Sequence, residues 1–100
     1  MFGLLDQDLD YIIKAIRQYT EIEKVKIFGS RAMGNYKKGS DVDIVIFGQH
    51  INDKTVARFS ETLNEEYPLP YFFDVIHYES ITNQRLTEHI DKLGIEIFTK

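Results

Sequence analysis

The stretch GSRAMGNYKKGSDVDIVIFG, Gly29–Gly48, decides how this chain folds. A Gly-Ser pair opens it, and Asp41 and Asp43 stand where a run of isoleucine, valine and phenylalanine begins. Such a continuous apolar run is typical of a strand that is covered on both faces. Because an unpaired buried charge is costly, the same region must contain or attract whatever offsets the two carboxylates.

Short β-type runs lie on both sides of this stretch. Val25–Phe28 leads into Gly29, residues 43–47 follow the two aspartates, and residues 71–78 form a third strand with Asp74 in its middle. Residues 95–98 are expected to form a last short strand or a packed tail. The β-branched and aromatic residues in these short runs support strands.

The segments between the strands have the spacing of apolar residues that is typical of helices. The spacing of apolar residues predicts helices over 4–19 and 54–67, and the second ends before Pro68. A third helix, capped by Ser80 or Thr82, is ended by Gly94. A short helix is expected to begin just after Ser30.

The lengths of the connections predict the strand directions. The segment between Phe28 and Asp43 is too short for a crossover helix between parallel strands, so those two strands are expected to be antiparallel. The segment from Phe47 to Tyr71 includes a full helix and suits parallel neighbours. The fold class is therefore α+β, of α/β type, with a small mixed β-sheet and helices packed on it.

Composition restricts the possible functions. The chain has 100 residues, 43% of them apolar, and is expected to form one domain over residues 1–100. Twelve basic against sixteen acidic residues give a net charge of −4, which argues against direct nucleic-acid binding. It has no cysteine, no basic leader and no apolar run long enough for a membrane, so we expect a cytoplasmic protein.

The aspartates carry the predicted chemistry. Side chains alternate along a strand, so Asp41 and Asp43 point to the same side, and Asp74 joins them if its strand pairs with theirs. Three carboxylates on one patch repel each other, and a hard divalent cation relieves that repulsion. Magnesium prefers such oxygen ligands, and two ions about 3.5–4 Å apart would form an arrangement used for phosphoryl transfer.

Gly29 and Ser30 supply the second part of the predicted site. Glycine lets the backbone approach a ligand closely, and free amides at a helix start bind phosphate. Arg31, with Lys37 and Lys38, adds positive charge nearby. The residues together predict a nucleoside triphosphate whose phosphates lie on Gly29–Ser30 and whose metals lie on the aspartates.

Each motif alone has a simpler interpretation. A single Gly-Ser pair is usually a turn, a single Asp-x-Asp is usually a solvated loop, and paired lysines are usually exposed. The order, the gap and the strand contexts together favour the nucleotide site. None of His50, His77 and His89 has a ligand or base geometry recognisable from sequence, and His77 is expected on the opposite strand face from Asp74.

Gly29-Ser30, ten residues and then Asp41-Val42-Asp43 resemble the G-S-x10-D-x-D signature of the polymerase-β-like nucleotidyltransferase superfamily. The longer string FGSRAMGNYKKGSDVDIVIF is similar to its smallest members, the minimal nucleotidyltransferase (MNT) domains. Met33 stands where those domains usually have a second arginine, which weakens a phosphate role there. FFDVIHY matches the strand that carries the third carboxylate, so the resemblance covers essentially the whole chain.

The resemblance implies a mixed sheet with helices packed on one side. It also implies that Asp41, Asp43 and Asp74 hold magnesium, with Asp74 deprotonating an acceptor hydroxyl that attacks the α-phosphate of ATP or another nucleoside triphosphate. MNT domains resemble antitoxins that act on a helical HEPN-type partner, so such a partner is expected here. The related polymerases and antibiotic-modifying enzymes have extra domains that hold the acceptor. We expect no such domain in a chain of this length, so a second chain or a second copy is expected to present the acceptor.

Three functions therefore remain open. The first is a magnesium-dependent nucleotidyltransferase that moves AMP from ATP to a hydroxyl on a HEPN-type partner, as the antitoxin of a toxin–antitoxin pair. The second is a non-catalytic antitoxin that masks its partner by stoichiometric binding. The third is a nucleotide-sensing subunit that binds ATP without turnover.

Overall fold

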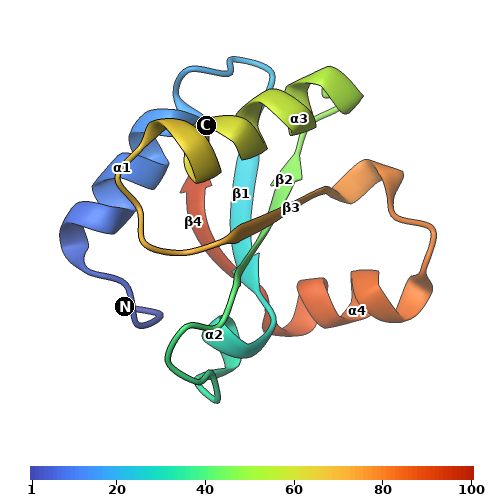
Figure 1. Ribbon diagram of the computed structural model, residues 1–100. Helices are drawn as coiled ribbons and strands as arrows, with labels where there is room; N and C mark the ends of the chain where they lie inside the picture. The colour runs from blue at the N-terminus through green and yellow to red at the C-terminus, as the bar shows by residue number, and fades with distance from the viewer.

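The computed structural model describes residues 1–100, and four strands with four α-helices account for most of them (Figure 1). In chain order the elements are α1 (Asp6–Ile16), β1 (Lys24–Phe28), α2 (Ser30–Met33), β2 (Val42–Phe47), α3 (Asp53–Glu61), a π-helical turn (Thr62–Glu66), β3 (Phe73–His77), a 3₁₀ turn (Tyr78–Ser80), α4 (Gln84–Leu93) and β4 (Ile95–Thr99). The predicted α+β class is confirmed.

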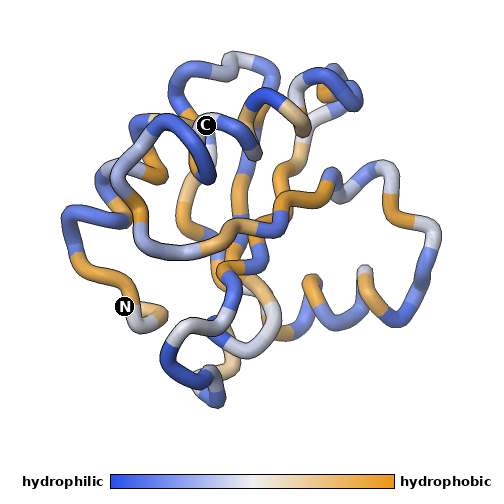
Figure 2. The backbone as a smooth tube through the Cα atoms, in the orientation of Figure 1, coloured by the Kyte–Doolittle hydropathy of each residue, from blue (hydrophilic) through white to orange (hydrophobic).

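The four strands form one mixed sheet in the order β3-β2-β1-β4. β1 pairs with β2 and with β4 in antiparallel fashion, and β2 pairs with β3 in parallel fashion. Both predictions from connection length are therefore confirmed, and residues 95–98 lie in a strand rather than in a packed tail. The result is a sheet whose central strands, β2 and β1, are apolar along most of their length (Figure 2).

Helices cover both faces of the sheet, which corrects the expectation that they pack on one side. Val42, Ile44 and Ile46 point to the face that α1 and α3 cover, where the larger apolar core lies. Val45 and Phe47 point to the opposite face, where Ile90 of α4 packs against them. Figure 1 shows α4 lying apart from α1 and α3, across the sheet from them. Helix α4 therefore covers the face of the sheet to which Val45 and Phe47 of β2 point.

The helix boundaries differ from the predicted ones because polar side chains end or begin the helices. The Asp8 carboxylate accepts a hydrogen bond from the Leu5 N–H at 3.0 Å, so α1 starts at Asp6. Asn83, rather than Ser80 or Thr82, caps α4 by accepting hydrogen bonds from the next amides. The helix predicted over 54–67 ends its regular α-helical part at Glu61 and continues as the π-helical turn.

Asn64, in the π-helical turn, fixes the outer edge of β3. Its amide group donates to the Phe73 carbonyl at 3.0 Å and accepts from the Phe73 N–H at 2.8 Å. An asparagine side chain thus supplies both bonds that a further strand would supply at this residue. Because Phe73 precedes Asp74, this contact also helps to hold one candidate site residue in place.

Asn64→Ala is expected to destabilise the protein by about 1–3 kcal/mol, because the Phe73 amide and carbonyl lose their partner. In a chain of this size that corresponds to a fall in Tm of about 4–8 °C for each kcal/mol. Asn35→Ala is the matched control, since Asn35 is exposed. Thermal denaturation followed by circular dichroism measures both, and equal Tm values for the two variants would contradict this role of Asn64.

None of the helices is long and apolar enough to cross a lipid bilayer.

Candidate functional site

The strand register brings Asp43 and Asp74 together. Asp43 is the register partner of Asp74 across the parallel pair and of Phe28 across the antiparallel pair. All three side chains therefore form one row across the sheet, on the face that α4 covers. Two carboxylates that are 31 positions apart in sequence thus become direct neighbours.

Gly29 lies against the Asp43 carboxylate. It follows β1 with a φ of 72°, a backbone conformation that side chains with a Cβ rarely adopt. A methyl group added to Gly29 would collide with Oδ2 of Asp43. A glycine is therefore required at this position for two reasons: its backbone conformation and the close approach of the Asp43 carboxylate.

Burial and neighbouring charge raise the pKa of Asp43 above its ordinary value of 3.8. Burial of the half-exposed carboxyl group is the largest cause, followed by repulsion from Asp74 and then from Asp41. The neighbouring carboxylates of Asp74 and Asp41 therefore both disfavour the ionised form of Asp43. This is the condition in which a bound cation stabilises all of them.

Asp41 and Asp74 are exposed, whereas Asp43 is half-buried. As the side chains lie, no three aspartate, glutamate or histidine residues are arranged to share one metal ion. Of the three carboxylates predicted to converge, Asp43 and Asp74 are register partners. Asp41 is close enough for its charge to act on Asp43. Magnesium is commonly held by one or two carboxylates with substrate phosphates and water, and these oxygen donors fit that description.

Arg31 is used differently from the expectation that it contacts phosphate. Its side chain is only 4% exposed, and three of its N–H groups donate to backbone carbonyls, two to Ser40 and one to Phe2. The guanidinium group also lies between the rings of Tyr36 and Tyr71, at 5.0 and 5.1 Å from their centres. These contacts anchor the loop that leads to Asp41.

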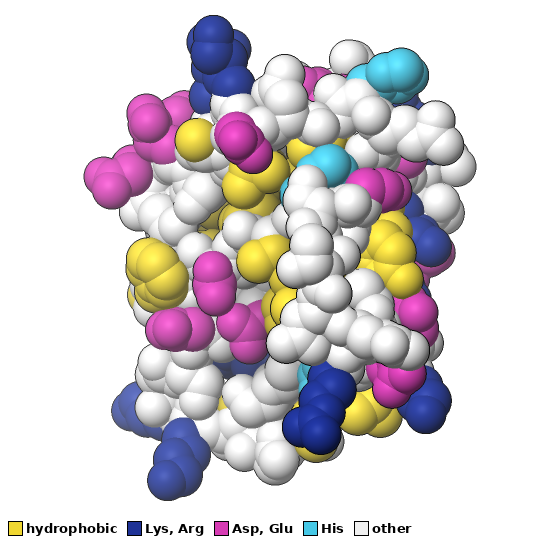
Figure 3. Space-filling model, turned by 90° about the vertical axis from the view of Figure 1, so that its right-hand side faces the viewer, with side chains coloured by type: hydrophobic (Ala, Val, Ile, Leu, Met, Phe, Trp, Pro, Cys, Tyr) yellow, Lys and Arg dark blue, Asp and Glu magenta, His cyan; other side chains and the backbone are white.

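Ser30 is half-buried and begins α2 directly after Gly29. The structure therefore places Gly29 and Ser30 at the end of β1, beside the row that holds Asp43. Lys37 and Lys38 are exposed in the loop that follows α2. On the face seen in Figure 3, several acidic side chains gather at mid-height, and basic side chains lie below them.

Sequence reasoning missed His89. This residue of α4 accepts a hydrogen bond at Nε2 from the Gly29 N–H, at 3.2 Å, and its ring meets that of Phe28 edge to face at 6.2 Å between centres. A signal was available, because His89 lies three residues after Leu86 and next to Ile90, on the predicted inner face of the helix.

The other two histidines take no part in the site. The His77 ring bonds the Gly48 carbonyl at 3.0 Å and the Ser80 hydroxyl at 2.8 Å, at the far end of β3 from the aspartates. His50 is exposed in the turn after β2. Both agree with the sequence-based interpretation.

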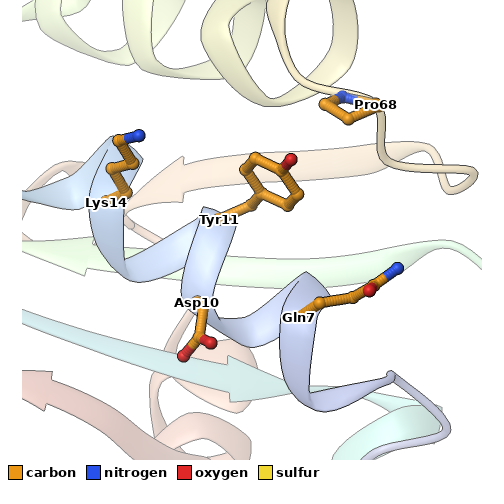
Figure 4. A pocket seen from close by; sticks show the side chains of 5 residues that line it. All are labelled: Gln7, Asp10, Tyr11, Lys14 and Pro68. Carbon is orange, nitrogen blue, oxygen red and sulfur yellow. The ribbon is translucent and has the colours of Figure 1, made fainter.

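A hollow of about 440 Å³ lies elsewhere, between α1 and Pro68, and contains none of the candidate residues. Its lining includes Gln7, Asp10 and Lys14, and the Tyr11 ring points across it toward Pro68 (Figure 4). It has neither a carboxylate pair nor a glycine turn. The candidate site is therefore the aspartate row rather than this hollow.

Residues 10–100 match the sequence model of the family described as polymerase beta, nucleotidyltransferase. No curated protein matches the chain.

Solved structures share the fold. A chain of a toxin–antitoxin crystal structure with AMP-PNP is 19% identical and has a TM-score of 0.78, and the match covers 96% of this chain and 75% of that one. A chain from the complex of a tri-AMPylated HEPN toxin with an MNT antitoxin, from Shewanella oneidensis, is 17% identical with a TM-score of 0.71, covering 94% and 71%. At such identities the likeness establishes the architecture of the chain.

Proposed function

The chain belongs to the polymerase β nucleotidyltransferase family, and on that premise we propose that it transfers a nucleoside monophosphate, AMP from ATP, to a hydroxyl group of a partner protein. The observation that carries the proposal is the register pairing of Asp43 with Asp74, with the Asp43 carboxylate seated on Gly29. An oxygen-rich acidic pair beside a glycine turn suits a triphosphate with its cation.

In this proposal Asp43, Asp74 and Asp41 hold magnesium, one or two ions together with phosphate oxygens of the nucleotide. When bound, magnesium neutralises charge on the phosphates and orients the attacking and leaving oxygens. Gly29 admits the triphosphate close to the backbone, and the Ser30 hydroxyl donates a hydrogen bond to a phosphate oxygen. Arg31 acts indirectly, by fixing through Ser40 the loop that carries Asp41.

Asp74 is the proposed proton acceptor, because it is exposed beside Asp43 and can face an incoming group. It takes the proton of the acceptor hydroxyl as that oxygen attacks the α-phosphorus. The bond between the α-phosphorus and the oxygen bridging to the β-phosphate breaks, and pyrophosphate leaves. The nucleoside monophosphate remains as an ester on the acceptor oxygen.

The proposed acceptor is a HEPN-type helical protein. The support is that chains of the same fold occur in a toxin–antitoxin structure with AMP-PNP and in a complex whose HEPN toxin is AMPylated. The chain would then act as an antitoxin that inactivates its partner by modification. The proposal places the protein in the cytoplasm, where ATP is available.

Incubating the purified chain with its HEPN-type partner, labelled ATP and magnesium tests transfer directly. We expect label on the partner, release of pyrophosphate in equal amount, and loss of both when a chelator removes magnesium. A partner that binds the chain yet receives no label from any of the four nucleoside triphosphates would contradict the proposal.

A non-catalytic antitoxin is the second candidate. It is favoured because no three acidic or histidine side chains are arranged so that they could share one metal ion. Changing Asp41 and Asp43 together to asparagine separates the two functions. Transfer requires the carboxylates, so the double variant should lose neutralisation of the partner in cells. Full neutralisation by the double variant, with partner binding unchanged, would show that masking suffices. A nucleotide-sensing subunit would instead bind ATP in calorimetry without releasing pyrophosphate.

Magnesium alone is expected to raise the Tm of the chain. Burial, and after it repulsion from Asp74 and Asp41, raises the pKa of Asp43, and a bound cation stabilises the ionised carboxylates of the folded chain. Differential scanning fluorimetry with and without millimolar magnesium measures the shift. The Asp43→Asn variant should show a much smaller shift, which ties the effect to this site. An equal shift in both proteins would indicate that the ion binds elsewhere.

A further inference from the structure

His89 connects helix α4 to the glycine turn of the candidate site. The Gly29 N–H donates a hydrogen bond to His89 Nε2, which is the acceptor in this contact. The ring also rests edge to face on Phe28, the residue before the turn. Two independent contacts therefore orient the imidazole toward the end of β1.

Gly29 lies between two groups that belong to different parts of the chain. Its N–H bonds His89 of α4, its carbonyl accepts the Met33 N–H at 3.1 Å, and its Cα faces the Asp43 carboxylate of β2. A glycine at positive φ has little intrinsic preference for one conformation, so these partners determine where the turn lies. Among them, only His89 holds the amide.

Helix α4 is also held by apolar packing and by one hydrogen bond to the turn that precedes it. Ile90 is its only buried residue, and a hydrogen bond from the Tyr78 hydroxyl to Asp91 ties its outer side to the preceding 3₁₀ turn. His89 directly precedes Ile90 and is the residue of α4 that bonds the Gly29 amide of the candidate site. The helix therefore delivers a single polar acceptor to the Gly29–Ser30 turn.

We propose that His89 is a positioning residue of the nucleotide site, whose Nε2 keeps the Gly29–Ser30 turn seated against Asp43 so that the turn can receive the triphosphate. This inference rests on the proposed function, because it concerns the same site. His89 does not touch the reacting atoms in this account. It acts through the backbone amide of Gly29.

Two substitutions of nearly equal size distinguish a positioning role from simple packing. The amide of a glutamine places its oxygen where Nε2 of histidine lies, so His89→Gln keeps the acceptor. The shorter asparagine cannot reach, so His89→Asn loses it while keeping a polar amide. His50→Asn is the control, because His50 is exposed and makes no contact with the site.

The measurements are the affinity of the chain for ATP with magnesium, by calorimetry, and hydrogen exchange of the Gly29 amide, by NMR. We expect His89→Asn to weaken ATP binding about fivefold and to speed exchange of the Gly29 amide, in proportion to one lost hydrogen bond. His89→Gln should restore both to within about twofold of the wild type, and His50→Asn should change neither.

The outcomes separate this inference from the proposed function. His89→Asn with wild-type affinity, or His89→Gln as weak as His89→Asn, would overturn the positioning role while the proposed function stands. A wild-type chain that binds no ATP would remove the proposed function, and the inference with it, whatever the Gly29 amide does. Weakened binding in His89→Asn alone, accompanied by faster exchange at Gly29, would establish the role.

Discussion

Replacing Asp43 with asparagine is expected to lower nucleotidyl transfer by at least about a hundredfold, because cation-mediated charge stabilisation in such sites contributes several kcal/mol to the barrier. Asp43 is the central member of the row, next to both Phe28 and Asp74. Asparagine has the same size, so it still fits against Gly29 but carries no charge. Transfer of labelled AMP to the partner, followed at saturating ATP, measures the loss.

Asp10→Asn is the control for Asp43→Asn, because Asp10 is an exposed aspartate of α1 beside the remote hollow. It removes the same charge from the same protein and should leave transfer unchanged. Asp74→Asn should lose activity as strongly as Asp43→Asn, since it removes both a metal ligand and the proposed proton acceptor. Activity in Asp43→Asn within tenfold of the wild type would contradict the assigned site.

For Asp43→Asn we also make a prediction about stability in the absence of magnesium. The pKa of Asp43 is raised in the folded state, so between its ordinary value of 3.8 and the raised value the folded chain binds more protons than the unfolded chain. The free energy of unfolding must therefore fall as pH rises through that window. Asp43→Asn removes this penalty and should melt higher than the wild type at neutral pH, with the advantage vanishing as pH falls below the window. A constant difference in Tm across pH would show that Asp43 does not cause it.

Much of the site could be predicted because the strand pattern determines it. Once Asp41 and Asp43 are placed at the start of β2 and the long connection makes β3 parallel to it, the alternation of side chains brings Asp74 to the same face. Because side chains alternate strictly between the two faces of a strand, few alternative placements of Asp74 exist. The prediction needed only that the two strands be neighbours, and their register places Asp43 directly opposite Asp74.

The parts that sequence reasoning missed depend on long-range contacts without a periodic signal. The role of Arg31 depends on the carbonyls of Ser40 and Phe2, and no motif specifies which backbone oxygen a guanidinium group will find. His89 reaches Gly29 across 60 positions because α4 covers the second face of the sheet. The resemblance implied helices on one side only, so it gave no reason to bring that helix to the site.

Gly29→Ala is expected to abolish nucleotide binding and to destabilise the chain, two effects that a second glycine separates. Gly29 has a φ of 72° and a ψ of −154°, a combination found almost only in glycine, so an alanine there costs about 1–3 kcal/mol and should lower Tm by about 4–8 °C for each kcal/mol. The added methyl group also meets Oδ2 of Asp43, so the carboxylate must move away from the position that the proposed site requires.

Gly34→Ala should destabilise the chain without affecting nucleotide binding. Gly34 has a φ of 81° and nothing within 4 Å of the position that a Cβ would take. Gly34 lies in the left-handed helical region and has open space around it, so Gly34→Ala should lose less stability than Gly29→Ala. Only Gly29→Ala should lose ATP binding and transfer of AMP to the partner. Calorimetric titration with ATP and magnesium, done well below both melting temperatures, makes the comparison. Equal losses of binding in the two variants would mean that backbone strain, rather than the fit between Gly29 and Asp43, limits the site. Retained binding in Gly29→Ala would show that the carboxylate need not lie against the turn, and the proposed geometry would fail at its central contact.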